Sequence, residues 1–354
     1  MVRATPGPAV AASPGASVRA VTRPGTRGGG TRRTAAPTWP TACTPTGAVT
    51  GWAAVSRHAA CAHEQFRITI LHQPSGKVIG TATMHAVNTM TASTTAARWS
   101  ATSFLAVRSY TGVGLPSFAT SRLVGSCPGC VSAGLTWAKQ TDGKSWRGNG
   151  NVAVTGLTSG KVRKDVSGRW EITLGGAAWG NPVVVTLNLA LSRCDNAFAA
   201  SRRPAGCVFS NIPGTVGYSQ KTLPDFVQHV YGAQLSGLPG RLGTTSYLTR
   251  MTNETLKNRN GAKACPTSLT RPKDTQCDEY PFRSTREGAY TSKATAARSL
   301  PWCRMTDPER KGSKGWSRCF VTLRQNLSAT GTLSAFYLDE RMLEGDRFQV
   351  GYLP

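Results

Sequence analysis

The stretch that decides the fold of the C-terminal part of this chain is Cys277-Asp278-Glu279-Tyr280-Pro281-Phe282-Arg283-Ser284-Thr285-Arg286-Glu287-Gly288. It holds three carboxylates, whereas the whole chain has 17 acidic residues against 42 basic ones. Of those 17 acidic residues, 11 lie after residue 240. Carboxylate oxygens bind divalent cations, which in turn contact phosphate. The cluster therefore favours a site that hydrolyses phosphodiester bonds.

The local pattern of this stretch separates its carboxylates. Successive side chains of a strand point to opposite faces, so only one of Asp278 and Glu279 is expected to face a given site. Pro281 ends the strand, because proline cannot donate to a strand ladder. Ser284 and Glu287 then fit a capping box that begins a short helix. Glu287 therefore has two interpretations of equal weight, a structural cap and a catalytic carboxylate.

A second carboxylate pattern lies near the end of the chain. Leu333, Phe336, Glu340 and Leu343 recur at helical spacing, which places a carboxylate on the apolar stripe of a helix. A buried charge is costly, so Glu340 should be neutralised by a metal, an arginine or the counterion of a substrate. In the alternative interpretation, the helix is rotated so that Glu340 reaches solvent.

Length and charge limit the class of protein. A chain of 354 residues is long enough for two domains, since single cores usually stop growing below this length. Its net charge of +25 favours a polyanionic partner, because Lys and Arg that neutralise phosphates release condensed counterions. Anionic cell-wall polymers satisfy the same condition. The basic residues are spread over the whole chain, so charge predicts a class of partner and no particular site.

The N-terminal segment, residues 1–45, is rich in Pro, Gly and Ala and is predicted to be disordered. Residues 1–42 contain six arginines and no acid, and they lack the apolar core of a signal peptide. Either the assigned start misreads the true leader or export uses another route. No apolar run in the chain approaches the length of a transmembrane helix.

Residues 60–210 are predicted to form an antiparallel, β-rich, sandwich-like domain. Runs with strand character at residues 66–72, 78–85, 98–110, 168–174 and 182–192 alternate with clusters of Gly, Ser, Thr and Asp. Because this region holds few acidic residues, we expect an accessory binding or spacer module and no second catalytic domain.

Residues 220–354 form the second predicted domain, in which helical patterns occur. A helix ending near Gly237 is expected to carry Phe226, Val230 and Tyr231 on one face.

His229 lies in the same helix and is the only histidine after residue 85. A single histidine on a half-apolar helix is more often a packing residue than a base or a ligand, and this is the interpretation that we adopt.

The ten cysteines fall into neighbouring couples, which predicts short-loop disulfides and an oxidising compartment. These couples are Cys43 and Cys61, Cys127 and Cys130, Cys194 and Cys207, Cys265 and Cys277, and Cys303 and Cys319. Cys127-Pro-Gly-Cys130 also fits a redox motif, although a small structural loop is favoured. Other connectivities stay open, because spacing alone does not determine pairing.

The stretch from Cys277 to Gly288 resembles the central motif of the NucA/NucB deoxyribonucleases. Segments similar to the same family precede it at residues 235–240, 248–250 and 258–266, and follow it at residues 325–326, 333–337, 341–343 and 345–348. Several motifs in the expected order are far more specific than one short pattern. The resemblance covers roughly the last third of the chain.

The resemblance implies an α+β protein whose C-terminal domain has a ββα-metal-like nuclease fold. It implies that Asp278 is the general base that activates water, with Glu279 and Glu287 as further catalytic candidates. Glu340 is implied as the ligand of a divalent cation, Mg²⁺ or Mn²⁺. Among the residues themselves, Arg283 and Arg286 are candidates to clamp a phosphate of the substrate, and Asn326 is a candidate to orient the site or bind phosphate. The substrate that the resemblance implies is DNA, with RNA left open.

The function predicted from these patterns is that of a secreted, metal-dependent endonuclease with little sequence specificity, because no base-reading helix or finger is recognisable. The alternative is a non-catalytic protein that binds nucleic acid or the cell envelope and retains a nuclease fold. A wall-directed hydrolase is a third class, but it has no recognisable catalytic pair outside the same motif. No obligate protein partner is inferable.

Overall fold

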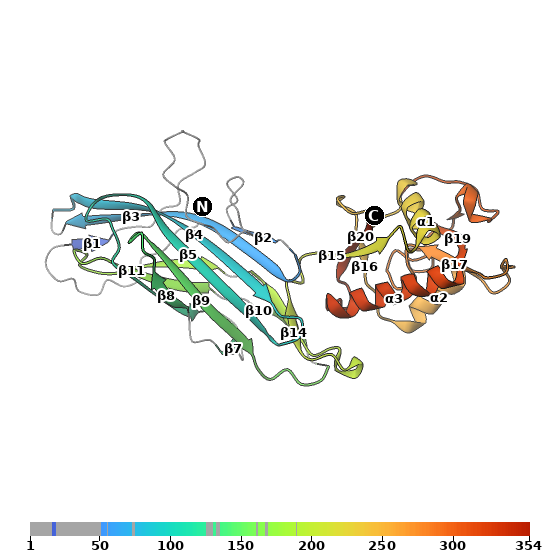
Figure 1. The fold of residues 1–354 in the computed structure, drawn as a ribbon, viewed down its shortest axis with the longest axis horizontal. Helices are drawn as coiled ribbons and strands as arrows, with labels where there is room; N and C mark the ends of the chain where they lie inside the picture. The colour runs from blue at the N-terminus through green and yellow to red at the C-terminus, as the bar shows by residue number, and fades with distance from the viewer. Residues whose placement is uncertain are drawn as a thin grey trace. The chain divides into compact units, whose positions relative to one another are not determined.

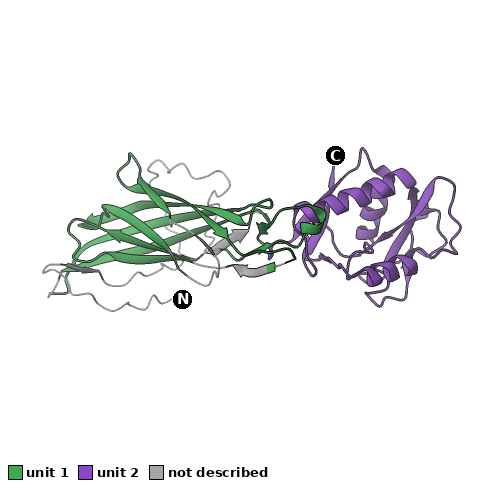
Figure 2. Cartoon of the chain, turned by 90° about the horizontal axis from the view of Figure 1, so that it is seen from below, with its two compact units in different colours: residues 1–209 green, residues 210–354 purple. Residues whose placement is uncertain are grey.

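A computed structural model describes residues 16–18, 51–54, 56–72, 75–124, 130–131, 135–160, 162–166, 169–188 and 190–354. The segment 1–45, for which disorder was predicted, lies outside the described residues except for 16–18. The chain divides into two compact units, residues 1–209 and residues 210–354, which Figure 2 shows in two colours. The described part of the chain is α+β, with β-rich antiparallel sheets in unit 1 and three α-helices in unit 2.

Unit 1 consists of antiparallel sheets (Figure 1). The largest has the order β1-β3-β4-β5-β9-β7, with β2 paired to β3 and β8 paired to β9. Its strands are β1 (Ala16–Val18), β2 (Gly51–Ala54), β3 (Ala59–His72), β4 (Val78–Ala92), β5 (Arg98–Gly112), β7 (Cys130–Val131), β8 (Thr136–Lys139) and β9 (Ser145–Val154). Two three-stranded sheets have the orders β12-β11-β6 and β10-β13-β14. They are formed by β6 (Phe118–Val124), β10 (Val162–Val166), β11 (Arg169–Gly175), β12 (Val183–Asn188), β13 (Ser192–Asp195) and β14 (Gly206–Val208).

Alternation of buried and exposed side chains explains these long strands. In β3, Phe66, Ile68 and Ile70 are buried, while the intervening Arg67 is exposed. The prediction of an antiparallel β-rich region is confirmed, and four of the five predicted strands coincide with β3, β4, β5 and β11. The fifth, at residues 182–192, is divided between β12 and β13.

Unit 2 mixes helices with two small sheets of orders β15-β20-β16 and β17-β19-β18. Its elements are β15 (Gly214–Ser219), α1 (Pro224–Leu235), β16 (Leu248–Thr249), α2 (Glu254–Ala264), β17 (Thr275–Tyr280), β18 (Ala297–Arg298), β19 (Trp316–Thr322), α3 (Leu323–Asp339) and β20 (Arg347–Leu353). Strands β17 and β19 are antiparallel, and α3 follows β19 directly. An aromatic-rich core joins the sheets to α1 and α3, with the Tyr218 and Phe226 rings 4.7 Å apart.

Helix α1 confirms the helix predicted to end near Gly237. It begins at Pro224, whose missing N–H costs no hydrogen bond in the first turn. Phe226 and Val230 are buried, whereas Tyr231 is 42% exposed and lies outside the core. Gly237 has a φ of 106°, a left-handed conformation that glycine adopts without strain.

Helix α3 ends earlier than the predicted apolar stripe requires. Its last residue is Asp339, and Glu340 is the C-cap. Arg341 has a φ of 46°, so the chain leaves the helical path before Leu343. The prediction that the helix continues through Leu343 was therefore wrong, and Glu340 does not lie on the buried face of a continuous helix.

The predicted capping box at Ser284 and Glu287 is also wrong. The residues directly after Pro281 form turns instead of a helix, and the side chains of Ser284 and Glu287 have other partners. The hydroxyls of Ser284 and Tyr337 are 2.9 Å apart, and the Glu287 carboxylate accepts a hydrogen bond of 2.8 Å from the Thr249 N–H.

Three disulfides join cysteines that were predicted to pair. They are Cys194–Cys207, Cys265–Cys277 and Cys303–Cys319. Cys61 is also disulfide-bonded. The predicted Cys43–Cys61 and Cys127–Cys130 pairs each include a residue outside the described part of the chain. Of the helices in the ranges described, none combines the length and apolar character needed to cross a membrane.

Candidate active site

The candidate site is a cleft beside strand β17. This strand is at the edge of its sheet, because the sheet has the order β17-β19-β18. A cleft of about 1000 Å³ opens on it and is lined by residues of β17, α2 and α3 and by the turn after Tyr280. Four predicted site residues line this cleft: Asp278, Glu279, Arg283 and Asn326.

The two adjacent carboxylates of the central motif, Asp278 and Glu279, reach the same cleft from opposite faces of β17. Asp278 lies on the face covered by α1, and Glu279 lies on the face that carries the disulfide of Cys277. The predicted alternation holds, yet both side chains line the cleft, because the free edge of a strand is accessible from either face.

Asp278 is held by a chain of buried hydrogen bonds. Its carboxylate Oδ2 accepts from His229 Nδ1 at 2.6 Å, and Ser317 Oγ lies 2.9 Å from His229 Nε2. His229 and Ser317 are fully buried, and Asp278 is 5% exposed. This chain fixes the plane of the Asp278 carboxylate, because each partner comes from a different element: α1, β19 and β17.

We expect Ser317→Ala to destabilise the protein by about 1–3 kcal/mol, because His229 Nε2 would be buried without a partner. Urea denaturation of the two proteins measures this difference. Ser313→Ala, at an exposed position, is the control and should leave the midpoint unchanged. Equal midpoints for Ser317→Ala and the native protein would contradict the role given to this contact.

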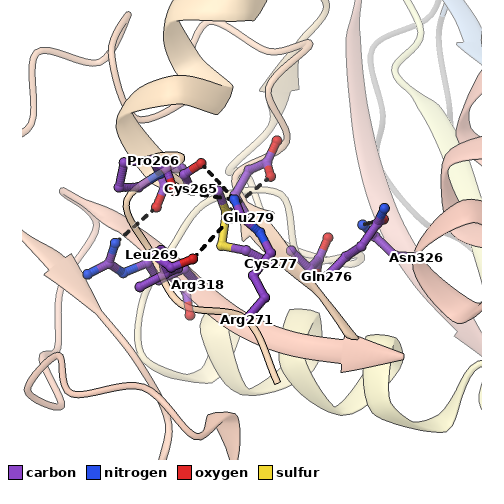
Figure 3. Close-up of a disulfide and its surroundings, with 12 residues drawn as sticks. Cys265, Pro266, Leu269, Arg271, Gln276, Cys277, Glu279, Arg318 and Asn326 are labelled. Carbon is purple, nitrogen blue, oxygen red and sulfur yellow. Dashed lines mark hydrogen bonds between the residues drawn. A yellow bond between two sulfur atoms is a disulfide. The ribbon is translucent and has the colours of Figure 1, made fainter. Parts of the chain in front are cut away.

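Glu279 lies beside the disulfide that joins α2 to β17, as Figure 3 shows. Its carboxylate Oε2 is 3.8 Å from Cys265 Sγ. Burial, together with the neighbouring Asp278 carboxylate, raises the pKa of Glu279 to about 8. At neutral pH this group therefore holds its proton in the folded protein.

The raised pKa of Glu279 predicts a pH dependence of stability. Between the ordinary value of 4.5 and about 8, the folded state keeps a proton that the unfolded state has released. The free energy of unfolding should therefore fall as pH rises through this window, by at most about 1.4 kcal/mol per pH unit. Denaturation at several pH values measures the slope, which Glu279→Gln should reduce and Glu309→Gln, at an exposed position, should not. Identical slopes for Glu279→Gln and the native protein would refute this prediction.

Basic side chains surround the carboxylates. Arg250, Lys257, Arg271 and Arg283 line the cleft. Arg271 donates to the Cys265, Pro266 and Leu269 carbonyls after α2, some of which Figure 3 draws. Arg283 Nη2 donates to Asn258 Oδ1 at 2.6 Å. These contacts hold cationic groups at the opening, which suits a polyanionic ligand.

Helix α3 supplies one wall of the cleft. Asn326, in its first turns, donates from Nδ2 to Gln276 Oε1 of β17 at 2.9 Å. The rest of this wall is largely apolar, with Leu333 and Ala329 facing the cleft. Asn326 therefore links helix α3 to strand β17, the strand that carries Asp278.

Three predicted site residues do not line the cleft. Arg286 forms an ion pair with Glu344 at 2.9 Å on an exposed surface. The Glu287 carboxylate caps the Thr249 N–H. Glu340 follows the last turn of α3. The structure thus brings four of the seven predicted residues together and separates these three.

The donors of the cleft fit a hydrated cation. Among the residues that the structure describes, no three His, Cys, Asp or Glu side chains are arranged to hold a metal ion. The oxygen donors on the cleft include the carboxylates of Asp278 and Glu279 and the amides of Gln276 and Asn326. Mg²⁺ commonly keeps several waters and is bound through one or two carboxylates and the phosphates of a substrate. This donor set is compatible with that mode of binding.

His229 and Ser317 are the site residues that sequence reasoning missed. The interpretation of His229 as a packing residue overlooked a usable signal, since its spacing from Phe226 and Ala233 places it on the buried face of α1. A buried histidine requires partners. Its partners Asp278 and Ser317 are 49 and 88 residues away in the chain, so spacing alone could not identify them.

Comparison with known proteins identifies a family for the part of the sequence that forms most of the cleft. No match to the chain is found among curated proteins or among solved structures. A family model, described as deoxyribonuclease NucA/NucB, matches residues 240–351. These residues include β17, α2, α3 and every charged residue that lines the cleft. The C-terminal third of the chain therefore matches the NucA/NucB deoxyribonuclease family.

Proposed function

We propose that unit 2 is an endonuclease that hydrolyses DNA phosphodiester bonds with the help of a divalent cation. The observation that carries this proposal is the pair Asp278 and Glu279 in a cleft edged by four basic side chains, all within the residues that match the family. Carboxylates and cations in the same cleft suit a phosphodiester, whose charge the cations neutralise while a carboxylate activates water.

Asp278 is the general base of this proposal. One carboxylate oxygen is held by His229, which leaves the other oxygen to accept a proton. Asp278 takes this proton from a water molecule while the water oxygen bonds to phosphorus and the bond from phosphorus to the 3′ oxygen breaks. The contact with His229 orients the base before the substrate arrives, so no reorganisation is needed during the reaction.

A Mg²⁺ or Mn²⁺ ion would stabilise the charge that develops on the phosphate and on the leaving oxygen. Glu279, which would release its proton on binding the cation, and Asn326 are the cleft residues that would hold it, together with water and phosphate oxygens. Glu340, the ligand implied by the family resemblance, is the alternative and is included in the tests below. The antiparallel strands β17 and β19 followed by α3 support a ββα-metal plan for this domain.

The substrate and the location are part of the same proposal. The basic residues contact a charged backbone and carry no base-reading pattern, so we expect little sequence specificity. The three disulfides are consistent with an extracellular protein, because such bonds persist in oxidising environments.

Plasmid cleavage by the oxidised full-length protein tests the function. We expect nicking with Mg²⁺ or Mn²⁺ and none after addition of a chelator. Single-stranded DNA and RNA substrates in the same assay define the substrate range. Retention of DNA on the protein without cleavage under any metal would overturn the enzyme and favour the non-catalytic binding protein.

A further inference from the structure

Two residues of the cleft carry buried hydrogen-bond donors that have no acceptor. They are Tyr218, from β15, and Arg250, which follows β16. The Tyr218 hydroxyl and the Arg250 Nε are inaccessible to solvent and have no partner in the structure. Buried polar groups are normally paired, because they lose their hydration without compensation when they are not. Their position on a cleft suggests that a ligand supplies the acceptors.

Arg250 packs on Tyr337 of α3, and Tyr218 and Tyr337 belong to the same buried cluster. The Arg250 guanidinium carbon lies 3.7 Å from the centroid of the Tyr337 ring, and the Tyr337 hydroxyl is 2.9 Å from Ser284 Oγ. Tyr218 is 1% exposed. Burial raises its pKa well above the usual value, and neighbouring Tyr337 and Asp278 add to this effect. Tyr218 therefore keeps its proton and lines the same cleft as Asp278.

The ligand should be an anion. Burial lowers the pKa of Arg250, although Tyr337, which also forms a hydrogen bond with this guanidinium, Glu344 and Asp346 oppose the shift. The carboxylates in its surroundings are those of Glu344 and Asp346. Glu344 is bound to Arg286 and Thr252, and Asp346 accepts a hydrogen bond from the Leu343 N–H. An arginine and a hydroxyl that both donate match the acceptor oxygens of a phosphate group.

We propose that Arg250 and Tyr218 form a subsite for a second phosphate of the nucleic acid, next to the phosphate at which Asp278 acts. This inference rests on the proposed nuclease function, and it assigns a binding site to the adjacent phosphate of the same nucleic-acid strand. Such a subsite holds the strand in register on the cleft, because two adjacent phosphates define its direction.

Binding of thymidine 3′,5′-bisphosphate and of thymidine 5′-monophosphate, measured by calorimetry on the oxidised full-length protein, tests the subsite. We expect the native protein to bind the bisphosphate at least about tenfold more tightly. Arg250→Gln and Tyr218→Phe should each remove most of this preference. Tyr218→Phe should also keep or raise the melting temperature, since it deletes only an unpaired hydroxyl.

Arg259→Gln is the matched control, because Arg259 also lies over a tyrosine ring, that of Tyr290, but does not line the cleft. It should keep the preference for the bisphosphate. Equal affinity of the native protein for both compounds, or an unchanged preference in Arg250→Gln, would overturn the subsite. If the native protein cleaves plasmid but does not prefer the bisphosphate, the subsite is refuted and the proposed nuclease function is supported. A preference that depends on Arg250, in a protein that cleaves nothing, would refute the nuclease alone.

Discussion

Replacement of Asp278 by asparagine is expected to lower the rate of plasmid cleavage by about 10²- to 10⁴-fold, the range for loss of a general base. Asparagine has nearly the same shape, and its amide oxygen still accepts from His229 Nδ1–H. The fold should therefore persist, so the loss reports on chemistry. Initial rates of nicking in Mg²⁺ and a thermal melt of each protein provide the measurement.

Asp274→Asn is the matched control for this substitution. Asp274 lines the same cleft and is exposed, so its replacement removes one negative charge without removing the proposed base. The nicking rates of Glu340→Gln and Asn326→Ala are measured in the same experiment. They compare Glu340, the cation ligand implied by the family resemblance, with Asn326, the cation ligand favoured by the geometry of the cleft. A protein that loses activity with Asp274→Asn but keeps it with Asp278→Asn would show that the base is wrongly assigned.

Removal of the Cys265–Cys277 disulfide should have the second large effect. The double substitution Cys265→Ser and Cys277→Ser opens a link across 12 residues, which should lower the free energy of unfolding by about 3 kcal/mol. Cleavage should also fall at least tenfold, because Cys277 adjoins Asp278 and Cys265 Sγ adjoins the Glu279 carboxylate. Denaturation and nicking rates under oxidising conditions measure both effects.

The Cys194–Cys207 disulfide of unit 1 offers a control of matched loop length, with a separation of 13 residues. Its removal should cost a similar free energy in unit 1 and leave the nicking rate unchanged. If both pairs of substitutions lower the nicking rate equally, the disulfide beside β17 has no special part in forming the site.

Local patterns predicted the elements of unit 2 that have a distinct apolar face. The spacing of apolar residues predicts helix α1, and Pro281 marks the end of strand β17. Both signals depend only on residues that are close together in the sequence. Helix α2 was not predicted, because only Asn260 and Ala264 of its residues are buried and it has almost no apolar stripe. Its one clear local signal is the Asn253 side chain, which caps the helix by accepting from the Leu256 N–H.

The site was predictable where residue type alone determines the chemistry. Asp278 and Glu279 stood out because acid is scarce in this chain, and they do line the cleft. Arg286 and Glu287 lie in the same motif but turn to Glu344 and Thr249, which are distant in sequence. Such choices depend on tertiary packing, so the linear pattern left Glu287 with two equal interpretations and assigned Arg286 to the substrate.

The disulfides described above have a consequence for how the chain matures. Each joins two cysteines that are consecutive along the chain, with separations of 12, 13 and 16 residues. On the proposed export of this protein, vectorial transport across a membrane would bring out the N-terminal cysteine of each couple first, and its native partner would follow next. An oxidant that simply joins cysteines in order of emergence would therefore produce these native bonds, so their formation needs no isomerase to reshuffle them.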